Sequence, residues 1–146
     1  MKDYVKIQFM SRPENVAFAR ASTAAFASRL NVTLEEIEEL RLVVSEAVSN
    51  CVVHAYPGDR EQKIELCAEI LEDERLELTV TDWGVGIADV AAALQSNYSN
   101  RPEHMGLGFT FMKTFMDQME VTSTPGQGTQ VRLVKCFGAN PDGGDL

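Results

Sequence analysis

Residues 33–55 read TLEEIEELRLVVSEAVSNCVVHA, and this stretch predicts a long helix with one buried side. Thr33 and Glu36 have the spacing of a capping box, in which each side chain bonds the backbone N–H of the other residue. Apolar residues then recur at steps of three and four, which aligns Ile37, Leu40, Val44, Ala47, Cys51 and Val52. We expect the helix to end near Ala55, because Pro57 and Gly58 follow.

The same helix carries a row of three polar residues. Glu46, Asn50 and His54 stand at i, i+4 and i+8, so they share one face that points away from the apolar stripe. Taken alone, such a row is more often a solvated polar face than a functional site. A functional explanation therefore needs support from other parts of the chain.

The flanking sequence predicts a sheet and two further helices. Alternating polarity over residues 5–9, 63–71 and 75–81 is typical of half-buried strands. Residues 14–30 predict an amphipathic helix, and 120–124 with 129–136 predict a closing hairpin. A last helix should open at Gly106 and carry Phe109, Met112, Phe115, Met116 and Met119.

This order of elements predicts an α+β fold. We expect a two-layer sandwich, in which helices cover one face of a mixed, mostly antiparallel sheet. Residues 1–137 should form a single domain with a polar lid over about 88–105. The breaker-rich segment 138–146 should be a disordered tail.

Composition limits the possible functions. The 146 residues carry a net charge of −9, which disfavours direct binding to nucleic-acid phosphates. No apolar run approaches the roughly 20 residues of a membrane span, and the N-terminus lacks the pattern of a signal peptide. Three distant cysteines without a CxxC pair indicate neither disulfides nor zinc, so we expect a soluble protein of the reducing cytoplasm.

Three short motifs outside the helix are suited to a nucleotide. Residues 82–86, DWGVG, place a carboxylate after a strand, where it can accept a hydrogen bond from an exocyclic amine. Residues 106–108, GLG, open a helix whose free N–H groups favour phosphate. Gly128-Thr129 lies in the hairpin. Each motif also has an ordinary explanation as a turn or helix start, but their fixed order and placement together favour ATP–Mg²⁺ binding.

These motifs resemble those of the GHKL ATPase superfamily, which has the Bergerat ATP-binding fold. Glu46–Asn50 is similar to its N box, Asp82–Gly86 to its G1 box and Gly106–Gly108 to its G2 box. At this chain length, VVSEAVSNCVVHAY over residues 43–56 most resembles the anti-sigma factor serine kinases. Residues 9–20 and 105–117 are similar to the sporulation members of that family, the anti-sigma F factors.

The resemblance implies an ATP-dependent serine/threonine-protein kinase with a role for each motif residue. It makes Glu46 the catalytic base and Asn50 the Mg²⁺ ligand. ATP would be bound by Asn50, His54, Asp82, Gly84, Gly86, Gly106, Leu107, Gly108, Phe109 and Thr129, with Asp82 and Thr129 at the adenine.

The resemblance also implies partners. These are a sigma factor of the sigma F type, an anti-anti-sigma factor as phosphorylation substrate, and a second copy in a homodimer. The net charge and the lack of a long apolar run separately lead us to expect no direct contact to nucleic acid or membrane. Two alternatives remain open at this stage. One is a stress-response type of anti-sigma kinase for another sigma factor, and the other is a nucleotide-gated binding module without phosphotransfer.

Overall fold

The structure is a computed structural model that describes residues 2–94 and 109–137. Its strands are β1 (Asp3–Met10), β2 (Lys63–Leu71), β3 (Arg75–Asp82), β4 (Gln118–Thr124) and β5 (Gly128–Cys136). Its helices are α1 (Glu14–Ala27), α2 (Leu34–Asn50), the π-helical turn η1 (Cys51–Ala55), α3 (Val90–Ala93) and α4 (Thr110–Phe115). No helix within the described ranges has the length and apolar character to cross a membrane.

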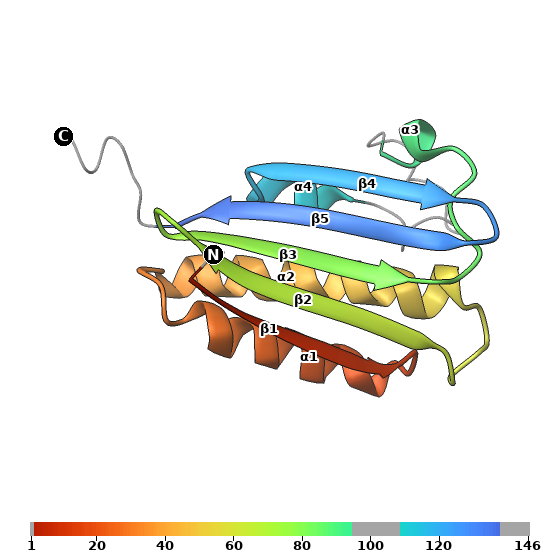
Figure 1. Cartoon of the computed structure of the whole chain (residues 1–146), viewed down its shortest axis with the longest axis horizontal. Coiled ribbons are helices and arrows are strands. Elements are labelled where there is room, and N and C mark those ends of the chain that lie inside the picture. Colours follow the sequence, from red (N-terminus) through yellow and green to blue (C-terminus); the bar gives the residue numbers. More distant parts are fainter. Residues whose placement is uncertain (1, 95–108, 138–146) are drawn as a thin grey trace.

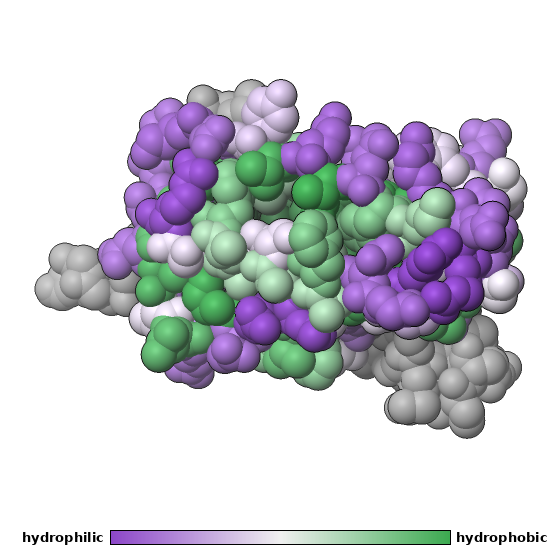
Figure 2. All heavy atoms as spheres, turned by 90° about the horizontal axis from the view of Figure 1, so that it is seen from below, coloured by the Kyte–Doolittle hydropathy of each residue, from purple (hydrophilic) through white to green (hydrophobic). Residues whose placement is uncertain are grey.

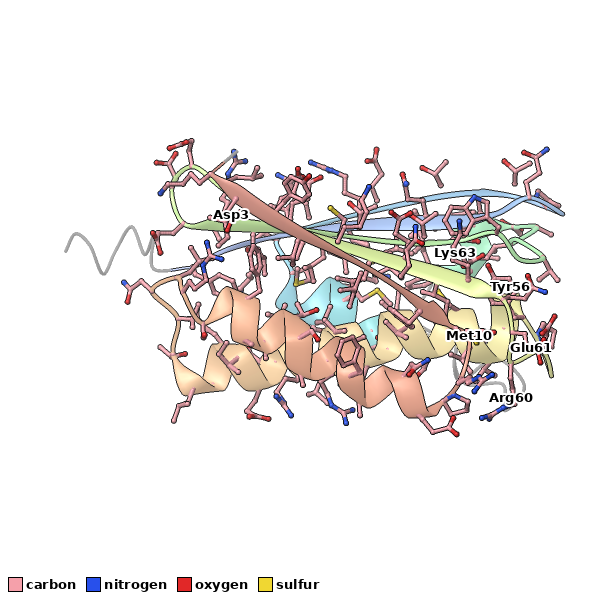
Figure 3. All side chains as sticks on the ribbon, turned by 60° about the horizontal axis from the view of Figure 1, so that its bottom comes forward. Asp3, Met10, Tyr56, Arg60, Glu61 and Lys63 are labelled. Atoms are coloured by element: carbon pink, nitrogen blue, oxygen red, sulfur yellow. The ribbon has the colours of Figure 1, made fainter. Side chains whose placement is uncertain are left out.

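The five strands form one sheet in the order β1-β2-β3-β5-β4 (Figure 1). Every pairing among these described strands is antiparallel. The sequence predicted a mixed, mostly antiparallel sheet, and the described sheet is antiparallel throughout. The helices α1 and α2 lie together on one face, and side chains project freely from the other face (Figure 3). The predicted two-layer α+β arrangement is therefore confirmed.

The core lies between the sheet and α2. Alternate residues of the central strands point inward and are buried, namely Ile64, Leu66, Ala68 and Ile70 on β2 and Leu76, Leu78 and Val80 on β3. The apolar stripe of α2 supplies the opposite side of the core with Leu40, Val43, Val44, Ala47 and Val48. This burial of one helix side against one sheet face fixes the rotation of α2, and hence the direction of its polar residues.

Both ends of α2 follow from local chemistry. At its start the capping box is confirmed, since the Glu36 N–H donates to Thr33 Oγ1 and the Thr33 N–H donates to Glu36 Oε1, each at 3.0 Å. At its end the α-helix stops at Asn50 and continues as the π-helical turn η1, closed by the Tyr56 N–H on the Cys51 carbonyl at 3.2 Å. The helical segment reaches Ala55, as predicted. The change from α-helical to π-helical winding after Asn50 was not predicted.

Two predicted helices are shorter in the structure. The first ends at Ala27 rather than near residue 30. The last, α4, ends at Phe115, so the prediction that it carries Met116 and Met119 is wrong. The reason is the sheet edge: the Asp117 N–H donates to the Val134 carbonyl at 2.8 Å, and the chain pairs with β5 from residue 118 onward. Met119 still packs against the core, from β4.

Candidate active site

A cavity of about 430 Å³ lies at the end of the sheet where β3 ends and β5 begins. In Figure 1 this is the end at which α3 lies. The volume is within the usual range of small-molecule sites. The lining is mostly apolar with a few polar groups: Ala47, Asn50, Cys51, His54, Ala55, Val80, Asp82, Gly86, Ile87, Ala88, Asp89, Ala92, Phe109, Thr129 and Val131. The cavity is thus the meeting point of the α2 row, the 82–86 motif and the hairpin.

Asn50, the last residue of α2, lines this cavity. Both Oδ1 and Nδ2 are buried, and neither has a hydrogen-bond partner within residues 2–94 and 109–137. Leaving a buried polar group unsatisfied costs about 1–3 kcal/mol, so the amide fits a site that a ligand completes. Its neutral oxygen suits Mg²⁺, which takes few protein ligands when phosphates and water supply the others.

His54 lies one turn further on, in η1, and lines the same cavity while half-buried. Two residues of the polar row, Asn50 and His54, therefore face the cavity. The alternative that this row is only a solvated surface of the helix is wrong for both residues. His54 belongs to the π-helical turn η1, which follows Asn50 directly. Such turns are rare and occur frequently at functional sites.

Glu46 lies one turn before Asn50 and outside the cavity lining. Its half-buried carboxylate accepts the Phe111 N–H at 3.2 Å, at the start of α4. Burial raises its pKa from 4.5 to about 7, and hydrogen bonds from the Phe111 and Met112 amides oppose that rise only in part. A carboxylate that titrates near neutrality is well matched to general-base work.

Asp82 is the last residue of β3 and is 5% exposed. Burial raises the pKa of its carboxyl group, although the amides of Gly84 and Thr129 and the Cys51 thiol favour the ionised form. The Gly84 N–H donates to Oδ1 at 2.9 Å. The sheet register places Asp82 opposite Thr129, so both side chains reach the cavity from adjacent strands.

The two glycines after Asp82 bring the 82–86 loop against its neighbours. A Cβ on Gly84 would lie 2.2 Å from the Ala55 carbonyl oxygen, which also accepts the Val85 N–H at 3.1 Å. Gly86 has φ +79, and a Cβ there would lie 2.4 Å from the Thr124 carbonyl oxygen. The loop is therefore clamped between the end of η1 and the hairpin, and of these two glycines only Gly86 lines the cavity.

Two residues of the site were not predicted from sequence. The Tyr56 hydroxyl accepts the Trp83 N–H at 2.6 Å and donates to the Lys63 carbonyl at 2.7 Å, which ties the 82–86 loop to β2. Figure 3 shows Tyr56 and Lys63 together at this end of the sheet. Cys51 lines the cavity beside Asp82, and burial raises the pKa of its thiol. Its position next to Asn50 is the one sequence feature that indicates a place in the site, because its spacing alone predicts only a residue of the apolar stripe.

The remaining predicted residues divide into two groups. Phe109 is buried and lines the cavity, as does Thr129. Gly106, Leu107 and Gly108 lie outside the described residues, as do positions 95–105 of the predicted lid and the tail 138–146. Within the described ranges no cluster of three or more His, Cys, Asp or Glu is placed to hold a metal ion. This is compatible with an Mg²⁺ held by Asn50 and phosphates.

Known proteins resemble this chain over most of its length. The model of the histidine kinase-like ATPase domain family matches residues 9–135. The chain is 47% identical over 136 residues to the anti-sigma F factor of Pasteuria penetrans, covering 92% of this chain and 91% of that protein. It is 44% identical over 140 residues to the anti-sigma F factor of Caldanaerobacter subterraneus, covering 93% of this chain and 95% of that protein.

Solved structures share the fold at low sequence identity. The RsbU and RsbW domains of a Mycobacterium tuberculosis protein match with a TM-score of 0.67 and 16% identity, over 92% of this chain and 32% of that one. A blue-light activated histidine kinase of Erythrobacter litoralis matches with a TM-score of 0.60 and 18% identity, over 89% of this chain and 43% of that one. The fold, the cavity and the relatives agree: the chain belongs to the histidine kinase-like (GHKL) ATPase family, in the group formed by the anti-sigma F factors.

Proposed function

We propose that this chain is an anti-sigma factor and serine-protein kinase of the cytoplasm. It would hold a sporulation sigma factor of the sigma F type and phosphorylate a serine of an anti-anti-sigma factor. The observation that carries the proposal is one cavity lined by Asp82 and by Asn50, whose buried amide is unsatisfied, with Glu46 one turn before Asn50 on α2. Family membership supports ATP as the nucleotide, and the names of the relatives support the sigma-factor partner.

In this proposal different residues of the cavity would bind different parts of ATP. Asp82 and Thr129 lie side by side and would bind the adenine amine, in a pocket closed by apolar residues. Asn50 would ligate Mg²⁺, which when bound neutralises charge between the phosphates. His54 and Phe109 line the same cavity, and Gly106, Leu107 and Gly108 would admit the phosphates. Gly84 and Gly86 would hold the loop that shapes the adenine side.

Glu46 would act on the incoming serine. The serine Oγ attacks the γ-phosphorus of ATP, the bond from that phosphorus to the β-phosphate oxygen breaks, and ADP leaves. The serine proton passes to the Glu46 carboxylate. Burial supports this role, because it brings the Glu46 pKa to about 7, where the carboxylate is both ionised and able to take a proton.

One observation favours the alternative of a nucleotide-gated binding module. The Glu46 carboxylate already accepts the Phe111 N–H, so it has a structural use in holding the start of α4. A binding module would need only that contact. Glu46→Gln separates the two functions, because a glutamine oxygen can accept the same N–H but cannot take a proton at neutral pH.

We also propose a homodimer through β1. This strand pairs only with β2 in the described sheet, so its outer edge is open. Exposed apolar side chains lie on β1 and the neighbouring α1, namely Tyr4, Val5, Met10 and Phe18. Figure 2, seen from below, shows hydrophobic surface over the middle of this face, with hydrophilic surface along its upper and right-hand parts. Sedimentation should give twice the mass of one chain, and a single-chain mass at micromolar concentration would contradict this part.

The experiment for the anti-sigma role is co-elution in size-exclusion chromatography. The chain is mixed with the sigma F-type factor in ATP–Mg²⁺, and a matched sample omits nucleotide. We expect co-elution with ATP–Mg²⁺, and release of the sigma factor when unphosphorylated anti-anti-sigma factor is added. Separate elution of chain and sigma factor under both conditions would refute the proposed partner.

A further inference from the structure

Ser123 has no role in the function described above, yet it lies beside the adenine pocket. The sheet register aligns Asp82 on β3, Thr129 on β5 and Ser123 on β4, so the three side chains form a row across neighbouring strands. Asp82 and Thr129 line the cavity, and Ser123 does not. Ser123 can therefore affect a bound base only through Thr129 or the adjoining backbone.

The half-buried Ser123 hydroxyl makes three contacts. The Ile87 N–H donates to Ser123 Oγ at 2.7 Å. The Ser123 hydroxyl lies 3.0 Å from the Gly128 carbonyl oxygen, to which it donates, and 2.8 Å from Thr129 Oγ1. The hydroxyl thus joins the end of the 82–86 loop, the hairpin turn and Thr129.

Counting protons fixes the direction of the contact with Thr129. A serine hydroxyl has one proton and two lone pairs. The Gly128 carbonyl can only accept, so the single Ser123 proton is used there. All three contacts are then satisfied only if Thr129 donates its own proton to Ser123 Oγ. Thr129, which lines the cavity, is left with lone pairs and no free proton on Oγ1.

We propose that Ser123 is a specificity-determining residue, which makes Thr129 a hydrogen-bond acceptor and so selects a purine with an exocyclic amine. Thr129 Oγ1 and the Asp82 carboxylate then present acceptors from adjacent strands. The 6-amino group of adenine supplies N–H donors to them, directly or through water. The 6-keto oxygen of hypoxanthine or guanine would instead face acceptors without a proton. This inference rests on the proposed binding of ATP in this cavity.

The test compares ATP with ITP, which carries a 6-keto oxygen in place of the amine. Dissociation constants for both are measured by competition against a fluorescent ATP analogue, for wild type, Ser123→Ala and Ser123→Thr. In Ser123→Ala the Thr129 hydroxyl can rotate and donate into the cavity, so the preference for ATP over ITP should fall about tenfold, the equivalent of one hydrogen bond. Ser123→Thr restores a hydroxyl and should restore the preference.

Two controls separate selection from general damage. Thr122→Ala removes a hydroxyl from the exposed neighbouring position of β4 and should leave the preference unchanged. In a Thr129→Val background, Ser123→Ala should no longer alter the ATP-to-ITP ratio, because the group through which it acts is gone. Thermal unfolding of each variant checks that the domain is folded.

The outcomes distinguish this inference from the proposed function. An unchanged ATP-to-ITP ratio in Ser123→Ala, or equal loss of both nucleotides, would overturn the inference and leave ATP binding in place. A wild-type chain that binds neither nucleotide would instead overturn the proposed function, and the inference with it. A lowered ratio that Ser123→Thr restores supports both.

Discussion

Glu46→Gln tests whether this carboxylate performs chemistry or only holds α4. Glutamine keeps an oxygen for the Phe111 N–H, which lies 3.2 Å from Glu46 Oε1, so the fold and the ATP affinity should be retained. The variant loses the group that takes the serine proton. General-base catalysis contributes about 10²–10⁴-fold, so phosphoryl transfer should slow by a factor in that range.

The pH dependence gives the same test in the wild-type chain. Because burial raises the Glu46 pKa to about 7, about a tenth of the molecules carry the ionised base at pH 6 and about nine tenths at pH 8. Single-turnover transfer from saturating labelled ATP should therefore rise about tenfold over that interval in wild type, and should lack this rise in Glu46→Gln. A flat wild-type profile, or wild-type rates in the variant, would refute the role of base.

The same pKa shift has a consequence for stability. Between pH 4.5 and about 7 the folded chain retains a proton on Glu46 that the unfolded chain has lost. The free energy of unfolding should therefore fall as the pH rises through this interval. Glu46→Gln should lack this contribution, and denaturant unfolding of both proteins at pH 5 and pH 8 measures it. An equal pH dependence in both would contradict the shifted pKa.

Three further substitutions and one control variant test the fold and the pocket. Asp82→Asn should lower the affinity for ATP and ADP at least tenfold in calorimetric titration, because a charged acceptor is lost. It should also raise the free energy of unfolding at neutral pH, because burial opposes ionisation of Asp82. An unaltered affinity for ADP would contradict the adenine contact. Gly84→Ala places a Cβ 2.2 Å from the Ala55 oxygen and should lower the free energy of unfolding by about 1–3 kcal/mol, together with ATP affinity. Gly126→Ala is the control for Gly84→Ala, because a Cβ on Gly126 meets nothing within 4 Å. This variant should lower stability only through the positive φ of Gly126, and should leave ATP affinity unchanged. An equal loss of ATP affinity in both variants would contradict the clamped loop. Thr33→Ala should lower the free energy of unfolding by about 0.5–2 kcal/mol through the lost cap, with ATP affinity unchanged, and an unchanged midpoint in urea would argue against the capping box.

The sequence was most informative where the local signal was strong. The capping box at Thr33 and the alternating strands β2 and β3 were predicted closely, because capping chemistry and period-two burial are encoded within a few residues. The spacing of the motifs also identified Asn50, His54, Asp82 and Thr129, which the fold brings to one cavity. Their convergence follows from the sheet order, which places β5 beside β3.

Features that depend on distant contacts could not be predicted from the sequence. The helix period aligned Glu46, Asn50 and His54 on an ideal helix, but η1 changes the winding after Asn50. The chain at Met116–Met119 has helical apolar spacing, yet pairing with β5 takes it into the sheet. Tyr56 and Ser123 contribute through hydroxyl groups that each bond more than one distant segment, and no local pattern marks such bonds.

Transfer of the γ-phosphate is the most direct test of the proposed kinase. The chain is incubated with γ-labelled ATP, Mg²⁺ and the candidate anti-anti-sigma factor, and the product is analysed by phosphopeptide mapping. We expect label on one serine of the partner, with loss of that label when Glu46→Gln replaces the wild type. ATP bound with no label on any serine would contradict the kinase and leave a nucleotide-gated binding protein in its place.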